Sequence, residues 1–172
     1  MYYYLSGYTA KVAATEMGIT EPTVTFSACF GAAFLPLHPT IYADLLGEKL
    51  QQENITVRLV NTGWIGGPYG IGNRIPLTYT RRLIHAALDG ELDTVKYTTL
   101  PIFDLSIPTS CPDMPDSILD PRQTWAGADT YDHSALQLAG KFREDFVQYR
   151  DHCSPQVSDV RPQKNLLKVQ IV

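Results

Sequence analysis

Residues 55–74 read ITVRLVNTGWIGGPYGIGNR. The β-branched run Ile55-Thr56-Val57-Arg58-Leu59-Val60 predicts a strand. Five glycines follow within the ten residues 63–72, and this density is costly in conformational entropy unless the backbone bends sharply or closely approaches a ligand. Behind the glycines comes a helical pattern whose apolar face comprises Leu83, Ile84, Ala87 and Leu88. Thr78 or Thr80 can cap this helix and Gly90 can end it. The predicted order is strand, glycine loop, helix.

The rest of the sequence alternates helical and β-rich segments. Apolar and aromatic residues at three-to-four spacing predict a first helix through Tyr4, Leu5, Tyr8 and Val12. A strand is expected over 23–30, and a helix from the cap Thr40 to about Asn54. The later segments are two short strands over 96–100 and 102–107, a loop over 108–121, and a last helix with Asp129 or Thr130 as its cap. Such alternation is typical of the α/β class.

The composition argues against several function classes. With 18 acidic against 14 basic side chains the formal net charge is −4, and no Lys/Arg stripe offers a footprint for nucleic acid. No apolar run approaches the roughly 20 residues that span a bilayer, and the first residues lack the pattern of a signal peptide, so a cytoplasmic protein is expected. The odd set Cys29, Cys111 and Cys153 predicts free thiols. Asp and His residues lack the spacing of a metal site, and no metal ligand is assigned.

The glycine loop is the strongest candidate for binding. Gly67 and Gly72 have the spacing of a phosphate-binding P-loop, but Asn73 and Arg74 stand where that motif needs Lys and Ser/Thr. The planar cation of Arg74 can still hydrogen-bond to a nucleotide or stack on it. The alternative is a long structural turn with Arg74 as a surface cation. Trp64 and the cluster Tyr2-Tyr3-Tyr4 are candidate stacking surfaces, although core packing is the commoner role of such residues.

Several segments carry motifs that are specific to one enzyme family. They are LSGYTAKVA at 5–13, EPT at 21–23, TFSACFGAAF at 25–34, LVNTGW at 59–64, GNRI at 72–75, TR at 80–81, IPT at 107–109 and ILDP at 118–121. In this order, over about residues 2–150, the chain resembles the C-terminal part of ATP-dependent phosphoenolpyruvate carboxykinase. The resemblance implies an α/β fold with part of a mononucleotide-binding domain, a mixed sheet with flanking helices, in residues 1–150. Residues 151–172 are left as an unmatched tail.

The resemblance also implies a reaction and a site. The family converts oxaloacetate and ATP to phosphoenolpyruvate, CO₂ and ADP in gluconeogenesis, with Mg²⁺ on the nucleotide and Mn²⁺ at the substrate. Its adenine and ribose contacts fall on Arg74 and Ile75, and a further nucleotide contact falls on Thr80. The family's P-loop, metal ligands and oxaloacetate-binding arginines have no counterpart in this sequence, so no catalytic residue is assigned and the isolated chain is expected to be inactive.

Three hypotheses follow for what the chain is. The first is a truncated carboxykinase that keeps the adenine side of the ATP site. The second is a nucleotide-binding or subunit-interaction piece that pairs with a separately encoded N-terminal half. The third is a decayed gene product without function.

Overall fold

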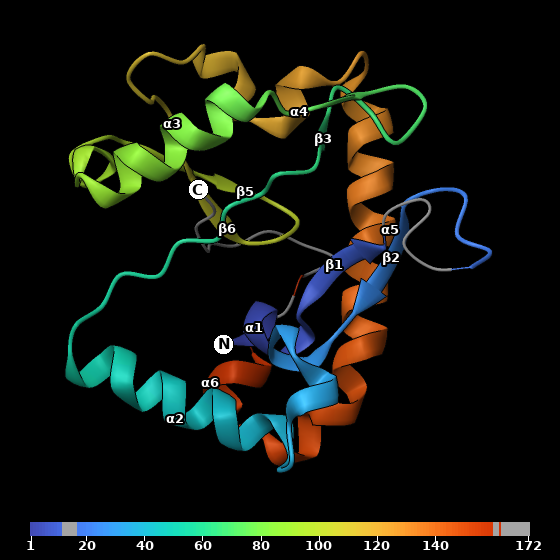
Figure 1. The fold of residues 1–172 in the computed structure, drawn as a ribbon, viewed down its shortest axis with the longest axis vertical. Helices are drawn as coiled ribbons and strands as arrows, with labels where there is room; N and C mark the ends of the chain where they lie inside the picture. Colours follow the sequence, from blue (N-terminus) through green and yellow to red (C-terminus); the bar gives the residue numbers. More distant parts are fainter. Residues whose placement is uncertain (12–16, 160–161, 163–172) are drawn as a thin grey trace. The chain divides into compact units, whose positions relative to one another are not determined.

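The computed structural model describes residues 1–11, 17–159 and 162 of the chain (Figure 1). These residues fall into two compact units. The first unit comprises Met1–Thr56 and Gly140–Arg161, and the second comprises Val57–Ala139 and Pro162–Val172. Helix α5, Ala128–Phe146, contributes its first part to the second unit and its last part to the first.

The first unit combines helices with one β-hairpin. Its elements are α1 Tyr2–Ser6, β1 Tyr8–Lys11, β2 Thr23–Phe26, α2 Pro39–Gln52, the end of α5 and α6 Pro155–Ser158, with 3-10 turns at Ala28–Phe30, Ala32–Phe34 and Val147–His152. Strands β1 and β2 are antiparallel, with Tyr8 opposite Phe26 and Lys11 opposite Thr23. The hairpin lies against α5 (Figure 1). Rings from both strands contact Phe142 of that helix.

An aromatic cluster forms the core of the first unit. Tyr2 is 2% exposed and stacks on Phe146 with 4.1 Å between the ring centroids. Its hydroxyl donates a hydrogen bond to the carbonyl oxygen of Phe142 at 3.1 Å. The ring of Phe142 lies 5.4 Å from that of Tyr8 and 5.1 Å from that of Phe26. Such pairs contribute about 0.5–1.5 kcal/mol each beyond their buried area, so this cluster ties α1 and the hairpin to α5. The core role is therefore confirmed for Tyr2.

The predicted first helix is wrong beyond Ser6. Helix α1 ends there because Gly7 adopts the left-handed conformation, with φ 55° and ψ 49°. Tyr8 then begins β1 instead of continuing the helix. A Cβ on residue 7 would lie 1.8 Å from the carbonyl oxygen of Ser27, so only glycine fits between α1 and the end of β2. Val12 lies outside the described residues.

The second predicted helix is confirmed, but its cap is different. Helix α2 covers Pro39–Gln52, and Asn54 beyond its end has a φ of 49°. His38 is the N-cap residue, and Pro39 follows at the first helical position, where its fixed φ suits a helix. Thr40 therefore lies inside the first turn, and its Oγ1 is 2.8 Å from Nδ1 of His38.

The strand expected over 23–30 is confirmed only as far as Phe26. Cys29 and Phe30 have φ values of 52° and 60°, which cannot continue an extended strand. The chain instead forms two short 3-10 turns between β2 and α2.

The second unit contains two further hairpins and one long helix. Its elements are β3 Trp64–Ile65, β4 Asn73–Arg74, α3 Leu77–Leu88, β5 Tyr97–Leu100, β6 Leu105–Pro108, α4 Pro121–Thr124 and the start of α5, with 3-10 turns at Glu91–Asp93 and Asp116–Ile118. Antiparallel pairing of β5 with β6 confirms the two predicted strands and leaves Pro101 in the turn between them. The core contains Ala86, Leu92 and Cys111, with Leu83, Ala87, Val95, Met114 and Leu119 packed around them.

The strand predicted over 55–60 is wrong. Residues 55–60 have no regular secondary structure, and Ile55, Val57 and Val60 are 53%, 58% and 40% exposed. A strand requires hydrogen bonds to a neighbouring strand. Within the described residues no backbone hydrogen bond to other backbone involves residues 56–62, and the side chain of Arg58 fixes this segment through Asp93 and Tyr97.

The chain mixes helices and strands, as expected, but the mixed sheet is not formed. In the described part of the chain the strands form three separate two-stranded antiparallel sheets. Each strand pairs with its nearest neighbour in sequence. Antiparallel strands can be joined by a short turn, whereas parallel strands need a longer crossover connection.

The expected helix caps are also corrected. Helix α3 begins at Leu77 after Pro76 as N-cap, so neither Thr78 nor Thr80 caps it. Helix α5 begins at Ala128, which places Asp129 and Thr130 inside its first turn. The end of α3 is confirmed, since Gly90 has a left-handed φ of 75° directly after the C-cap residue Asp89.

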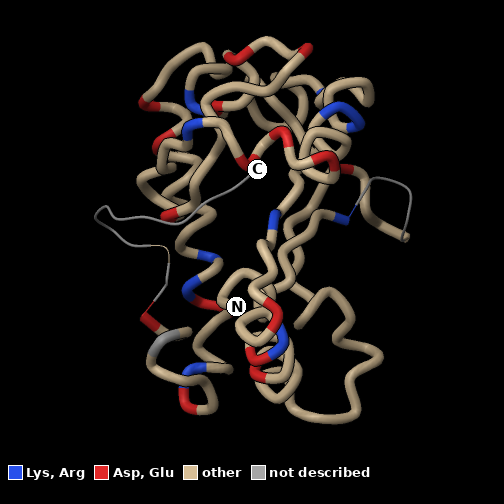
Figure 2. Tube along the Cα trace, turned by 90° about the vertical axis from the view of Figure 1, so that its left-hand side faces the viewer, with Lys and Arg blue, Asp and Glu red and all other residues tan. Residues whose placement is uncertain are grey.

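The distribution of charged residues and the state of the cysteines can be compared with what the sequence predicts. Lys and Arg residues occur singly or in pairs among Asp and Glu along the trace (Figure 2). Cys29, Cys111 and Cys153 are free thiols, as predicted. None of the helices in the described ranges is long and apolar enough to cross a membrane. The cytoplasmic location stays a prediction.

Gly7→Ala is expected to destabilise the chain strongly. The loss of unfolding free energy should exceed the roughly 1–2 kcal/mol cost of a left-handed alanine, because the new Cβ would overlap the Ser27 carbonyl. Gly18→Ala is the matched control, since Gly18 has a φ of 87° and its added Cβ meets nothing within 4 Å. Urea unfolding of both variants measures the difference. Equal losses would contradict the close contact at Gly7.

Candidate functional site

The candidate site is built on the short hairpin of β3 and β4. Trp64 lies opposite Arg74, and Ile65 lies opposite Asn73. The N–H of Ile75 donates to the carbonyl oxygen of Gly63 at 3.0 Å, which continues the pairing by one hydrogen bond. The loop between the strands is held from outside by α4, because the N–H of Gly66 donates to Oγ1 of Thr124 at 3.1 Å.

Close backbone packing explains part of the glycine density. Gly66, Gly67 and Gly70 have φ values of 76°, 150° and 84°, which disfavour other residues. A Cβ on Gly72 would lie 2.3 Å from the carbonyl oxygen of Gly67 and 2.5 Å from that of Ile65. The N–H of Gly72 also donates to the Pro68 carbonyl at 2.8 Å. The loop is therefore a tightly folded turn that fixes the positions of the residues on either side.

Arg74 and two aromatic rings form the chemical centre of the site. The guanidinium carbon of Arg74 lies 5.8 Å from the centre of the Trp64 ring, within the range of a cation–π contact. Trp64 meets Tyr69 edge to face at 5.4 Å between centroids. Arg74 and Tyr69 are exposed, and no carboxylate of the described residues forms an ion pair with Arg74. The hairpin thus presents an uncompensated planar cation beside an aromatic surface, a combination that can bind an anion or a flat heterocyclic ring.

The three predicted site residues differ in how far they are exposed. Arg74 ends β4 and Ile75 follows it directly, half-buried, with its N–H already used by Gly63. Thr80 is only 7% exposed within the first turns of α3, where its N–H donates to the Pro76 carbonyl at 3.2 Å. No hydrogen bond joins Thr80 to Arg74 or Ile75 within the described residues. Arg74 is therefore the most accessible of the three.

Sequence reasoning missed the contribution of the aromatic partners. The sequence pattern does not indicate Tyr69, and it indicates stacking by Trp64 only as the less common role of such a residue. The signal lies in the hairpin register, because residues 64 and 74 become direct neighbours once the glycines close the loop. Side chains on directly opposite positions of an antiparallel pair lie close enough to interact.

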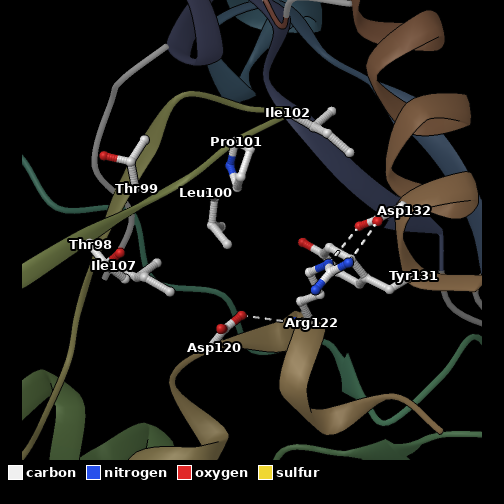
Figure 3. A pocket seen from close by; sticks show the side chains of 10 residues that line it. All are labelled: Thr98, Thr99, Leu100, Pro101, Ile102, Ile107, Asp120, Arg122, Tyr131 and Asp132. Carbon is white, nitrogen blue, oxygen red and sulfur yellow. Dashed lines mark hydrogen bonds and ion pairs between the residues drawn. The ribbon is translucent and has the colours of Figure 1, made fainter. Parts of the chain in front are cut away.

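A cavity of about 190 Å³ lies elsewhere in the second unit (Figure 3). Its apolar wall comes from the β5–β6 hairpin and consists of Leu100, Pro101, Ile102 and Ile107. Arg122 of α4 and Tyr131 and Asp132 of α5 face this wall (Figure 3). None of Arg74, Ile75 and Thr80 lines the cavity.

The charged side chains of this cavity are hydrogen-bonded. Arg122 binds Asp132 through two parallel hydrogen bonds, Nε to Oδ1 at 2.9 Å and Nη2 to Oδ2 at 3.0 Å. This contact lowers the pKa of Asp132, while burial raises the pKa of Tyr131 to about 12 and keeps its phenol neutral. Asp120 accepts hydrogen bonds from the backbone N–H of Arg122 and the side chain of Gln123. The Arg122–Asp132 pair therefore links α4 to α5 beside the cavity, which has room for roughly six water molecules.

The described residues offer no metal centre. Across those ranges no three His, Cys, Asp or Glu side chains are grouped closely enough to hold a metal ion.

Comparison with known proteins identifies relatives over nearly the whole chain. The family model described as phosphoenolpyruvate carboxykinase matches residues 1–117. The chain is 59% identical over 151 residues to phosphoenolpyruvate carboxykinase (ATP) of Caldanaerobacter subterraneus, which covers 88% of this chain and 29% of the relative. It is 52% identical over 162 residues to the protein of that name from Thermus thermophilus, covering 94% and 31%. The chain thus spans about three tenths of the length of these curated relatives.

Gly72→Ala is expected to disrupt the β3–β4 hairpin. Two carbonyl oxygens would have to move away from the new Cβ, and overpacking of this kind costs roughly 1–3 kcal/mol. Gly70→Ala is the control, because its added Cβ meets no atom within 4 Å. The measurement uses a Trp125→Phe background, which leaves Trp64 as the single tryptophan. The fluorescence emission maximum of Trp64 should shift in Gly72→Ala and stay unchanged in Gly70→Ala. Unchanged emission in both variants would contradict the tight turn.

Proposed function

The chain belongs to the phosphoenolpyruvate carboxykinase (ATP) family of carboxy-lyases, and from this membership we propose that it supplies the adenine side of an ATP site. The observation that carries the proposal is the exposed guanidinium of Arg74 beside the Trp64 ring. A flat adenine ring can stack on these planar groups, and the charge of Arg74 favours a nucleotide with its negative phosphates.

Ile75 and Thr80 have supporting roles in this proposal. The half-buried Ile75 offers apolar contact to the base or ribose next to Arg74. Thr80 acts mainly by fixing the start of α3, since it is 7% exposed. Nucleotide binding at the hairpin therefore depends chiefly on Arg74 and its aromatic neighbours.

The isolated chain binds nucleotide in this proposal but does not complete the reaction. Conversion of oxaloacetate and ATP to phosphoenolpyruvate, CO₂ and ADP requires cationic groups and divalent metal at the transferred phosphate. Across the described residues no three His, Cys, Asp or Glu side chains are grouped to hold a metal ion. Metal, phosphate and oxaloacetate binding then belong to a partner that carries the rest of the fold.

A partner polypeptide also accounts for the segment Ile55–Val60. Its β-branched side chains favour a strand, while its exposed Ile55, Val57 and Val60 have no strand beside them in the described structure. In the complete fold this segment becomes a strand of the mixed sheet when the partner supplies a neighbouring strand. The neighbouring strand then comes from the carboxykinase sequence that this chain does not span.

Mg-ATP is expected to raise the melting temperature of the purified chain. At about 100 times its dissociation constant, a ligand adds roughly 2.7 kcal/mol to a folded state that binds it. Arg74→Ala should abolish this gain, whereas Arg150→Ala, which removes an exposed arginine from the first unit, should retain it. Thermal melts with and without Mg-ATP make the measurement. An equal gain in Arg74→Ala and the wild-type chain would reject the hairpin as the site.

The purified chain alone is expected to form no phosphoenolpyruvate. An assay with oxaloacetate, Mg-ATP and Mn²⁺ should match the protein-free rate, because the described residues supply no group of metal ligands. The Caldanaerobacter carboxykinase assayed alongside is the positive control. Turnover above background by the chain would overturn the proposed division between binding and catalysis.

A further inference from the structure

Helix α3 is apolar on two sides. Its inner side contributes Ala86, Leu83 and Ala87 to the core of the second unit. A second set, Leu77, Ile84 and Leu88, is 62%, 37% and 79% exposed. A helix at the surface of a globular protein normally has one apolar stripe and a polar opposite face. The exposed set therefore needs a separate explanation.

The exposed apolar residues lie along one stripe of the helix. At about 100° per residue, positions 77, 84 and 88 fall within roughly 40° of one another around the helix. They extend along about 16 Å of its length. Arg81, which is exposed as well, lies between Leu77 and Ile84 along the helix, at the edge of this stripe. Apolar residues gathered on one exposed face can mark a site of contact with another part of a protein.

We propose that the stripe Leu77, Ile84 and Leu88 is the docking surface for the part of the carboxykinase fold that this chain does not span. The proposal rests on the family membership and partner of the proposed function. The chain corresponds to only 29% and 31% of the length of its relatives, so most of a relative's sequence is available to cover this helix. The occupant is an apolar segment of that remaining sequence, with an acidic side chain opposite Arg81.

A second copy of the chain fits this surface less well. A stable dimer buries about 800 Å² per subunit, and three aliphatic side chains on one short helix supply much less. The stripe is suited to one contact within a larger interface. In such an interface, apolar residues at the buried centre carry most of the binding.

Cysteine labelling in two intact proteins tests the proposal. Leu88→Cys is made in this chain and at the aligned position of the full-length Caldanaerobacter relative, and peptide-resolved mass spectrometry follows alkylation without nucleotide. The control is Glu144→Cys, an exposed polar position on α5. We expect labelling at position 88, normalised to the control, to be at least about tenfold slower in the relative. Equal normalised rates would overturn the proposal, as would protection in this chain that grows with its own concentration, which would identify a second copy as the occupant.

Paired polar substitutions give an independent readout. Leu77→Gln with Leu88→Gln should leave the melting temperature of this chain unchanged, because both residues are exposed. The same double change in the full-length relative should lower its melting temperature by roughly 4 °C or more. Leu136→Gln, at a 42% exposed position on α5, controls for the substitution itself. No loss in the relative would contradict docking. Neither experiment uses ATP, so failure of nucleotide binding at Arg74 leaves these outcomes unaffected.

Discussion

The close backbone contact at Gly72 is the constraint on which the candidate site depends. Because residue 72 has no Cβ, the carbonyl oxygens of Gly67 and Ile65 can approach the space that a side chain would fill. The loop therefore turns back within a few residues and brings β4 beside β3. This register alone places Arg74 over the ring of Trp64. The functional group of the site is a side chain, but its position is determined by backbone geometry that only glycine permits.

Glycine positions also show how much of the fold could be predicted. Gly90 follows a clear apolar helix, and its local pattern correctly predicts the left-handed end of α3. Gly7 has the same conformation, but the surrounding Tyr4, Leu5 and Tyr8 have helical spacing, so the pattern predicts one long helix. The deciding contact at Gly7 is with Ser27, twenty residues away in the sequence. Local patterns do not contain such a contact.

Strand prediction fails at 55–60 for a related reason. The β-branched run has the right local preference, yet β-propensity reflects packing against neighbours more than a property of the backbone itself. The hairpins β1–β2 and β5–β6 form because each strand finds its partner close by in the sequence. For the candidate site, Arg74 was identified from the glycine loop and from the family resemblance, whereas Tyr69 becomes apparent only when the loop is closed.

The two units are built around different cores, and the core of the second unit bears on function. The first unit buries an aromatic cluster around Phe142 and Phe146, which stabilises it from within. The second unit buries an aliphatic core under one side of α3, while Leu77, Ile84 and Leu88 on another side of that helix are exposed, as are Val57 and Val60. Any ligand or partner that binds only the folded state stabilises it by mass action. Nucleotide at the hairpin and protein on α3 would both stabilise the folded state of the second unit. Where folding of that unit is incomplete, binding of one would therefore strengthen binding of the other.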